Sequence, residues 1–177
     1  MLRERARAAL IPQAALVVIV AIGVFAASCS GGSDGADGPD SYIPESVAGT
    51  PVDTENALAT SLADGLGDQG VDATASGVVV KDDKAVLILL ALEGSEDKID
   101  EMRDQLLGSF SILPSQDPSA SEEVDGTELD VYEGTAQRDP VSVAAAVPAQ
   151  SVLLVAVALE GGDAAAAAAM REMLNAQ

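Results

Sequence analysis

Two apolar segments of this chain, Val86–Gly94 (VLILLALEG) and Leu153–Gly161 (LLVAVALEG), resemble each other at an offset of 67 residues. Both consist of aliphatic residues and both end in Leu-Glu-Gly. Continuous aliphatic runs are typical of central strands buried on both faces, although an apolar run alone does not separate a strand from a buried helix. The segments that precede them favour strands.

The resemblance extends toward the N-terminus of each segment. SGVVV at Ser76–Val80 aligns with VAAAV at Val143–Val147, and the polar turns Lys81–Lys84 (KDDK) and Pro148–Ser151 (PAQS) align between the apolar runs. A short polar turn between two apolar runs is the pattern of a β-hairpin. Each copy is therefore predicted to be strand, tight turn, strand and helix.

A helix is predicted after each second strand. In the first copy Ser95 is a suitable N-cap and Gly108 a C-terminal stop, and four residues share one face: Ile99, Met102, Leu106 and Phe110. In the second copy Asp163 is the predicted cap of a helix that contains six consecutive alanines, 164–169. Alanine has the highest helix propensity, and its small side chain lets a helix lie close to a sheet.

Three further segments complete the predicted domain. A helix is expected over 54–66, capped by Asp53 or Thr54, with Leu58, Leu62 and Leu66 at four-residue spacing. Residues 113–126 (LPSQDPSASEEVDG) are expected to form a loop. Residues 127–134 (TELDVYEG) alternate acidic and apolar side chains, which predicts an edge strand.

The predicted fold class is α+β. We expect an antiparallel sheet of four or five strands with helices packed on it. Two ββα repeats, at about 75–108 and 142–175, would build this sheet with approximate two-fold symmetry.

The first 28 residues are predicted to be a signal peptide. Arg3, Arg5 and Arg7 give a positive start, and 14–27 is uncharged but shorter than the roughly 18 to 20 apolar residues of a membrane-spanning helix. Small residues at 26–28 then lead into Cys29, the only cysteine of the chain.

This arrangement resembles the signal sequence of bacterial lipoproteins. The resemblance implies that Cys29 is diacylated on sulfur and becomes the new N-terminus, which would anchor the chain stably in a membrane. One departure is Ala26, because the family usually has Leu or another branched aliphatic residue at that position. The alternative is an uncleaved signal anchor in which Cys29 stays a free thiol.

Residues 29–41 are predicted to be the anchored cysteine and a linker, followed by a single domain over 42–177. The tract SGGSDGADGPD after Cys29 is rich in Gly, Ser and Asp. It lacks the alternating ligands and closing Glu of a calcium loop, so a solvated spacer is the preferred interpretation.

The charge of the chain limits its partners. The full chain has a net charge of −20; loss of residues 1–28 removes three arginines and Glu4, which leaves six basic and 28 acidic residues and a net charge of −22. Nucleic acid is therefore not an expected partner, because phosphate binding depends on Lys and Arg. A basic or cationic protein partner is favoured.

The residue types present also limit the chemistry. The chain has no histidine, and its single cysteine allows neither an intrachain disulfide nor a thiolate zinc site. The weak metal candidates are Glu128 and Asp130, in an acidic segment that is otherwise interpreted as a charged edge strand. Glu93 and Glu160 are either strand-end residues or a pair that converges near the two-fold axis.

The mature sequence, with IPESVAG (Ile43–Gly49) after a low-complexity tether, resembles small surface lipoproteins of high-GC Gram-positive bacteria. That resemblance implies a location on the extracytoplasmic face of the cell membrane rather than an activity. The first hypothesis is a lipid-anchored, non-catalytic interaction or ligand-binding domain without a cofactor. The alternative is a divalent-cation-binding or carboxylate-based hydrolase domain.

Overall fold

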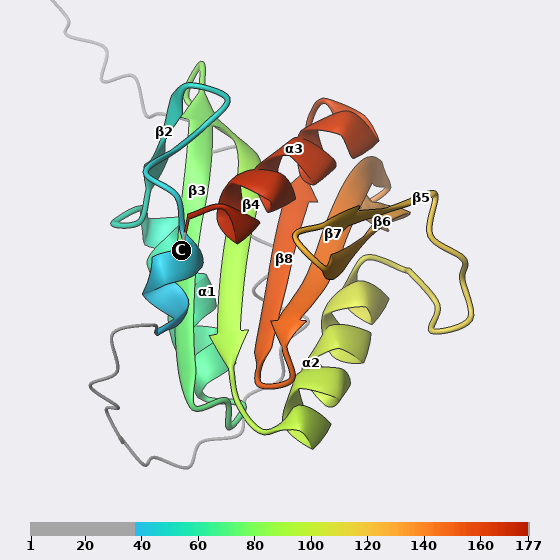
Figure 1. Ribbon diagram of the computed structural model, residues 1–177. Helices are drawn as coiled ribbons and strands as arrows, with labels where there is room; N and C mark the ends of the chain where they lie inside the picture. Colours follow the sequence, from blue (N-terminus) through green and yellow to red (C-terminus); the bar gives the residue numbers. More distant parts are fainter. Residues whose placement is uncertain (1–37, 177) are drawn as a thin grey trace, which may run out of the picture.

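The computed structural model describes residues 38–176. The predicted signal peptide, Cys29 and most of the linker lie outside these residues. Within them the chain forms one antiparallel sheet of eight strands, with helices on both of its faces (Figure 1).

The strands lie in the order β1-β2-β3-β4-β8-β7-β6-β5 across the sheet. Their bounds are β1 Ser46–Val47, β2 Thr50–Asp53, β3 Ala73–Lys81, β4 Lys84–Glu93, β5 Ala120–Val124, β6 Thr127–Ala136, β7 Asp139–Ala149 and β8 Val152–Ala158. A 3₁₀ turn, η2 (Pro39–Tyr42), precedes them, and the helices are α1 Ala57–Gly67, α2 Glu96–Ser109 and α3 Gly162–Leu174.

The prediction of four or five strands is wrong, because three short strands were missed. Two of them, β1 and β2, are joined by Ala48 and Gly49, and β5 is joined to β6 by Asp125 and Gly126. All four of these turn residues have positive φ angles, the geometry of a tight two-residue hairpin turn. The third missed strand, β5, lies within the predicted loop 113–126. Because β5 pairs with the outer side of β6, β6 is not the edge strand that was expected.

The central strands carry apolar side chains on both faces, as their continuous apolar sequences predict. On one face Leu87 and Leu89 of β4 lie in a cluster with α3. On the other, Ile88 and Leu90 lie in a cluster with α1 and α2. The two hairpins meet where β4 pairs with β8, and Leu89 lies opposite Ala156.

These paired positions, Leu89 and Ala156, are also 67 residues apart in the sequence. A local two-fold axis perpendicular to the sheet would relate the two hairpins in this register. The helices do not follow that relation, because α2 and α3 cover opposite faces. The connection into α3 contains Gly161 (φ 88°) and Gly162 (φ 62°), whereas Ser95 stands at the position that aligns with Gly162. The internal repeat therefore stays an interpretation of the sequence.

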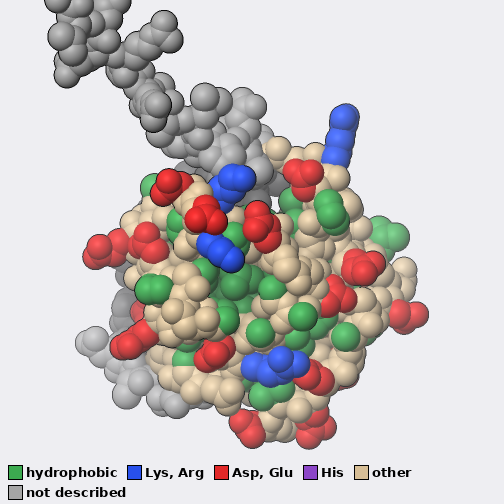
Figure 2. All heavy atoms as spheres, turned by 90° about the horizontal axis from the view of Figure 1, so that it is seen from above, with side chains coloured by type: hydrophobic (Ala, Val, Ile, Leu, Met, Phe, Trp, Pro, Cys, Tyr) green, Lys and Arg blue, Asp and Glu red, His purple; other side chains and the backbone are tan. Residues whose placement is uncertain are grey.

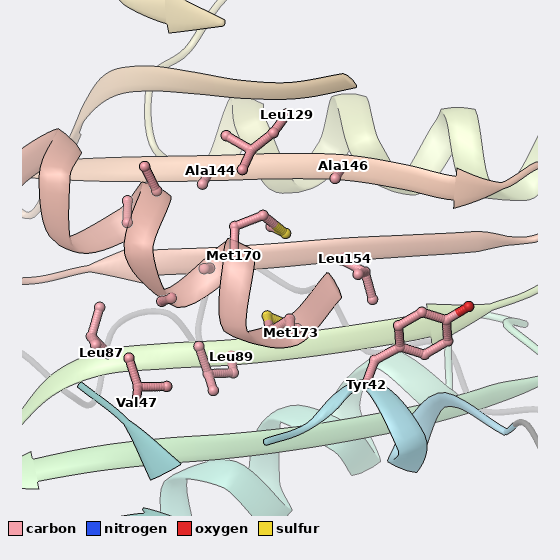
Figure 3. Close-up of a cluster of buried hydrophobic side chains, with 14 of the residues drawn as sticks. Tyr42, Val47, Leu87, Leu89, Leu129, Ala144, Ala146, Leu154, Met170 and Met173 are labelled. Carbon is pink, nitrogen blue, oxygen red and sulfur yellow. The ribbon is translucent and has the colours of Figure 1, made fainter. Parts of the chain in front are cut away.

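Small residues let α3 approach the sheet closely. Ala166 and Ala169 are fully buried, and they belong to the same cluster as Ala144 of β7 and Ala156 of β8. Figure 3 shows the longer side chains of the helix, Met170 and Met173, pointing toward the sheet. Burying each such side chain contributes about 1.5–3 kcal/mol, so this face is a major part of the core.

The helix starts differ in part from those predicted. Asn56, not Asp53 or Thr54, is the N-cap of α1, and its Oδ1 accepts a hydrogen bond from the backbone N–H of Leu58 at 3.0 Å. Ser95 is the N-cap of α2, as predicted, although its side chain makes no capping hydrogen bond. Asp163 lies inside the first turn of α3, where the N-cap is Gly161.

Candidate functional site

An open cavity of about 850 Å³ lies at the end of the sheet where β8 leads into α3. One wall is the end of β6 and the start of β7, with Gly134 and Pro140. The other wall is the connection Leu159–Asp163. In Figure 2, which looks onto this end of the molecule, hydrophobic side chains lie at the centre, and both acidic and basic side chains surround them.

Among residues 38–176, the cavity is lined by three carboxylates and by no lysine or arginine. Glu133 comes from β6, Glu160 from the residues that follow β8, and Asp163 from the first turn of α3. Glu133 and Glu160 are exposed, so both can meet a ligand that enters from solvent. The uncharged lining includes Val141, Leu159 and Pro140, which offer an apolar surface between the acids.

Asp163 is fixed by two serines. Its Oδ1 accepts a hydrogen bond from Ser142 Oγ at 2.7 Å, and its Oδ2 lies 2.8 Å from Ser119 Oγ. Ser142 is 5 % exposed and belongs to β7, whereas Ser119 immediately precedes β5. The negative charge of Asp163 also complements the positive end of the α3 dipole. These hydrogen bonds hold the Asp163 carboxylate in a defined position in the wall of the cavity.

A second polar cluster joins α2 to β6 and β5. Arg103 Nη2 donates to Asp130 Oδ2 at 3.3 Å and to the Tyr132 hydroxyl at 3.2 Å. Ser121 Oγ donates to Asp130 Oδ1 at 2.7 Å. Burial raises the pKa of Tyr132, with a smaller contribution from the Asp130 charge, while the Arg103 charge opposes the shift.

The predicted metal candidates are not brought into a common site. Asp130 accepts hydrogen bonds from Arg103, Tyr132 and Ser121, and Glu128 is an exposed residue of β6. Among residues 38–176 no group of three or more acidic side chains has the geometry of a metal site. Glu122 of the neighbouring strand β5 forms an ion pair with Arg171 of α3 at 2.7 Å.

The repeated glutamates lie at opposite ends of the sheet. Glu93 ends β4 and pairs with Val152, whereas Glu160 follows the end of β8, where Ala158 pairs with Leu87. Six residues along a strand correspond to roughly 20 Å. The two glutamates therefore do not converge, and Glu93 lies at the end of a strand, as the preferred interpretation of the sequence predicted.

Sequence reasoning did not predict the cavity. Its acids are far apart in the chain, at 133 and at 160–163, and only the pairing of β6 with β7 and of β7 with β8 brings them to one end. The one local signal is EGGD at 160–163, where two glycines follow a strand and lie between two acids.

Comparison with models of known protein families, with curated proteins and with solved structures found no match to this chain. Within residues 38–176 no helix has both the length and the apolar character needed to cross a membrane. Proposals about function therefore depend on the sequence and on the geometry of the cavity.

Proposed function

We propose that the chain is a membrane-anchored, non-catalytic binding domain that takes a cationic ligand or a basic side chain of a protein partner into the acid-lined cavity. The observation that supports this proposal is that Glu133, Glu160 and Asp163 line a cavity to which the described part of the chain contributes no basic residue. Cations are attracted to a cleft of one charge sign, because its low-dielectric walls focus the electric field.

The dimensions of the cavity agree with this proposal. Its volume of about 850 Å³ is within the range of small-molecule sites and is large for a single lysine or arginine side chain. The apolar lining residues Val141 and Leu159 would contact the methylene groups of such a side chain, while the carboxylates meet its charged end. Several cationic groups, as in a polyamine or a basic peptide, would fill it better than one.

The anchoring part of the proposal comes from the sequence. A positive start, an uncharged segment and the single Cys29 favour lipid attachment and an extracytoplasmic location. A Cys29→Ala chain should then move from the membrane fraction to the soluble fraction. If it stayed in the membrane, an uncleaved signal anchor would explain the data better.

The binding part is tested with tetralysine as the probe and the full-length protein in non-ionic detergent. Each ion pair between an exposed carboxylate of the cavity and a lysine of the probe contributes about 1 kcal/mol or less. The double variant Glu133→Gln, Glu160→Gln removes two such pairs, so calorimetry should show that it binds tetralysine about tenfold more weakly. The matched control Asp72→Asn, Glu93→Gln removes two charges near the opposite end of the sheet, where Asp72 N–H donates to Glu93 O. Equal losses in both variants would show that total charge, not the cavity, attracts the probe.

The hydrolase alternative has less support. Asp130 is held by an arginine, a tyrosine and a serine, and the repeated glutamates lie at opposite ends of the sheet. No observation in the described residues favours a pair of carboxylates placed for glycoside hydrolysis.

A further inference from the structure

The strand β5 forms one outer edge of the sheet and has an unpaired side. Among the described residues it pairs only with β6, through the register Ser121↔Asp130 and Glu123↔Glu128. The other edge of the sheet, β1, is only two residues long, so β5 is the longer open edge. A strand edge of this kind presents unpaired N–H and C=O groups to solvent.

The register shows which groups these are. In a hairpin closed by a two-residue turn the flanking residues, here Val124 and Thr127, form a hydrogen-bonded pair, and hydrogen-bonded pairs alternate along the ladder. The backbone groups of Val124 and Glu122 therefore point toward β6. Those of Glu123 and Ser121 point away from the sheet, at the spacing that an added strand would use.

The segment before β5 makes hydrogen bonds with β6 rather than with the outer side of β5. Ser119 N–H donates to Val131 O at 2.7 Å, and Gln116 Nε2 donates to Glu133 O at 3.0 Å. Both acceptors belong to β6: Val131 is paired with Ala120 at the start of β5, and Glu133 lies beyond the residues that β5 pairs. These contacts cover β6 at and beyond the start of β5, and within residues 38–176 no strand pairs with the outer side of β5.

Charge distinguishes among the possible occupants of this edge. Glu123, Asp125 and Glu128 are exposed beside it, while the basic Arg171 nearby is already paired with Glu122. A second copy of β5 would bring these acids against one another, and like charges directly opposite are destabilising. The tract 30–41 of this chain is also acidic. A basic strand avoids this repulsion.

We propose that β5 is a strand-addition site for an extended basic segment of a partner protein, which pairs with the outward backbone groups of Ser121 and Glu123. Backbone hydrogen bonds provide affinity in this mode of recognition, and alternate side chains provide specificity. The acids beside the edge exclude another copy of the chain and attract lysine or arginine. The site is separate from the cavity, so it does not depend on the cavity function.

The test uses full-length protein in non-ionic detergent and a fluorescent heptapeptide that alternates lysine and valine. The variant Glu123→Pro removes the outward N–H while Glu123→Gln keeps it, and both remove the same charge. We expect Glu123→Pro to weaken peptide binding by about tenfold more than Glu123→Gln does, because Pro cannot donate to an added strand. The same difference between Glu123→Pro and Glu123→Gln should remain when both are made in the cavity variant Glu133→Gln, Glu160→Gln, because the outward N–H of Glu123 does not depend on the cavity acids.

A second arm keeps the test informative if Glu123→Pro disturbs the hairpin. The same peptide with all internal amides N-methylated keeps its charges but cannot pair as a strand, so it should bind the unchanged protein at least about tenfold more weakly. Equal binding of both peptides would overturn the proposal, since attraction would then be charge alone. Loss of peptide binding only in the cavity variant would overturn it as well and would assign the peptide to the cavity.

Discussion

At the scale of single residues, Gly134 is required by close packing between β6 and the end of α2. A Cβ at this position would lie 2.7 Å from Phe110 O and 3.1 Å from the Ile112 side chain. The carbonyl cannot yield easily, because it accepts a hydrogen bond from Thr135 N–H at 2.8 Å. Gly134→Ala should therefore lower the free energy of unfolding by about 1–3 kcal/mol.

Thermal unfolding measures this loss, at roughly 2–4 °C in Tm per kcal/mol for a chain of this size. The matched control is Gly65→Ala in α1, where a Cβ meets nothing within 4 Å. That change should raise stability by about 0.5–1 kcal/mol, because alanine loses less conformational freedom in a helix. A Gly134→Ala chain as stable as the unchanged protein would show that the connection after α2 is loosely packed.

Tyr132 gives a pH-dependent prediction at the same scale. Its pKa is raised above the usual 10.0, first by burial. Because the folded state favours the neutral phenol, this contribution to stability is present in full below pH 10 and is lost as the pH rises through the folded pKa. Absorbance of tyrosinate, taken as the difference from Tyr132→Phe, should titrate above the usual value.

Two variants test the causes of this shift. Arg103→Gln removes a charge that lowers the pKa of Tyr132, so the midpoint should rise further. Asp130→Asn removes a charge that raises the same pKa, so the midpoint should fall. Shifts of the same sign in both variants would indicate that burial, altered by either change, outweighs the two charges.

At the scale of the secondary structure elements, long apolar strands and amphipathic helices could be predicted and short hairpins could not. The buried face of α2, with Ile99, Met102 and Leu106, was predicted from its spacing and is confirmed. The strands β1, β2 and β5 carry no continuous apolar run. Their signal is in the turns, where Ala48-Gly49 and Asp125-Gly126 have positive φ angles. Glycine at the second turn position is a recognised hairpin signal that apolar periodicity overlooks.

The close packing of α3 on the sheet predicts that larger side chains on its buried face destabilise the fold. Ala169 is fully buried against the sheet, whereas Ala164 on the same helix is exposed. Ala169→Leu should cost about 1–3 kcal/mol of stability, because the added atoms would force the helix away from its close contact. Ala164→Leu should change stability little, by about 0.5 kcal/mol or less. Denaturant unfolding of both variants compares them directly, and a tolerated Ala169→Leu would mean that this face contains unfilled space.

At the scale of the whole molecule, the α+β class and the acidic charge could be predicted, but the site could not. The sequence aligned Glu93 with Glu160, yet the antiparallel pairing of β4 with β8 places them at opposite ends. Glu133, by contrast, has no sequence feature that connects it with Glu160. Chain direction and strand order determine which acids meet, and neither can be derived from the local pattern around each acid.

The large negative net charge predicts that the stability of the folded protein depends on salt concentration. Residues 38–176 contain six basic and 26 acidic residues, and the three salt bridges found among them are partly exposed. Exposed pairs contribute little, so repulsion among the unpaired acids should dominate the electrostatics of the folded state. Salt shortens the range of charge interactions to about 10 Å at 0.1 M. Stability should therefore increase from low to moderate sodium chloride.

Thermal unfolding at a series of salt concentrations measures this increase. A variant with three fewer charges, Asp104→Asn, Glu123→Gln, Glu128→Gln, is the control, since these acids are exposed and Asp104 and Glu123 make no ion pair in the described residues. Its Tm should be higher at low salt and should depend less on salt, because there is less repulsion left to screen. If Tm instead fell with added salt in both proteins, the few ion pairs would outweigh the repulsion, and the acidic surface would be stabilising rather than merely tolerated.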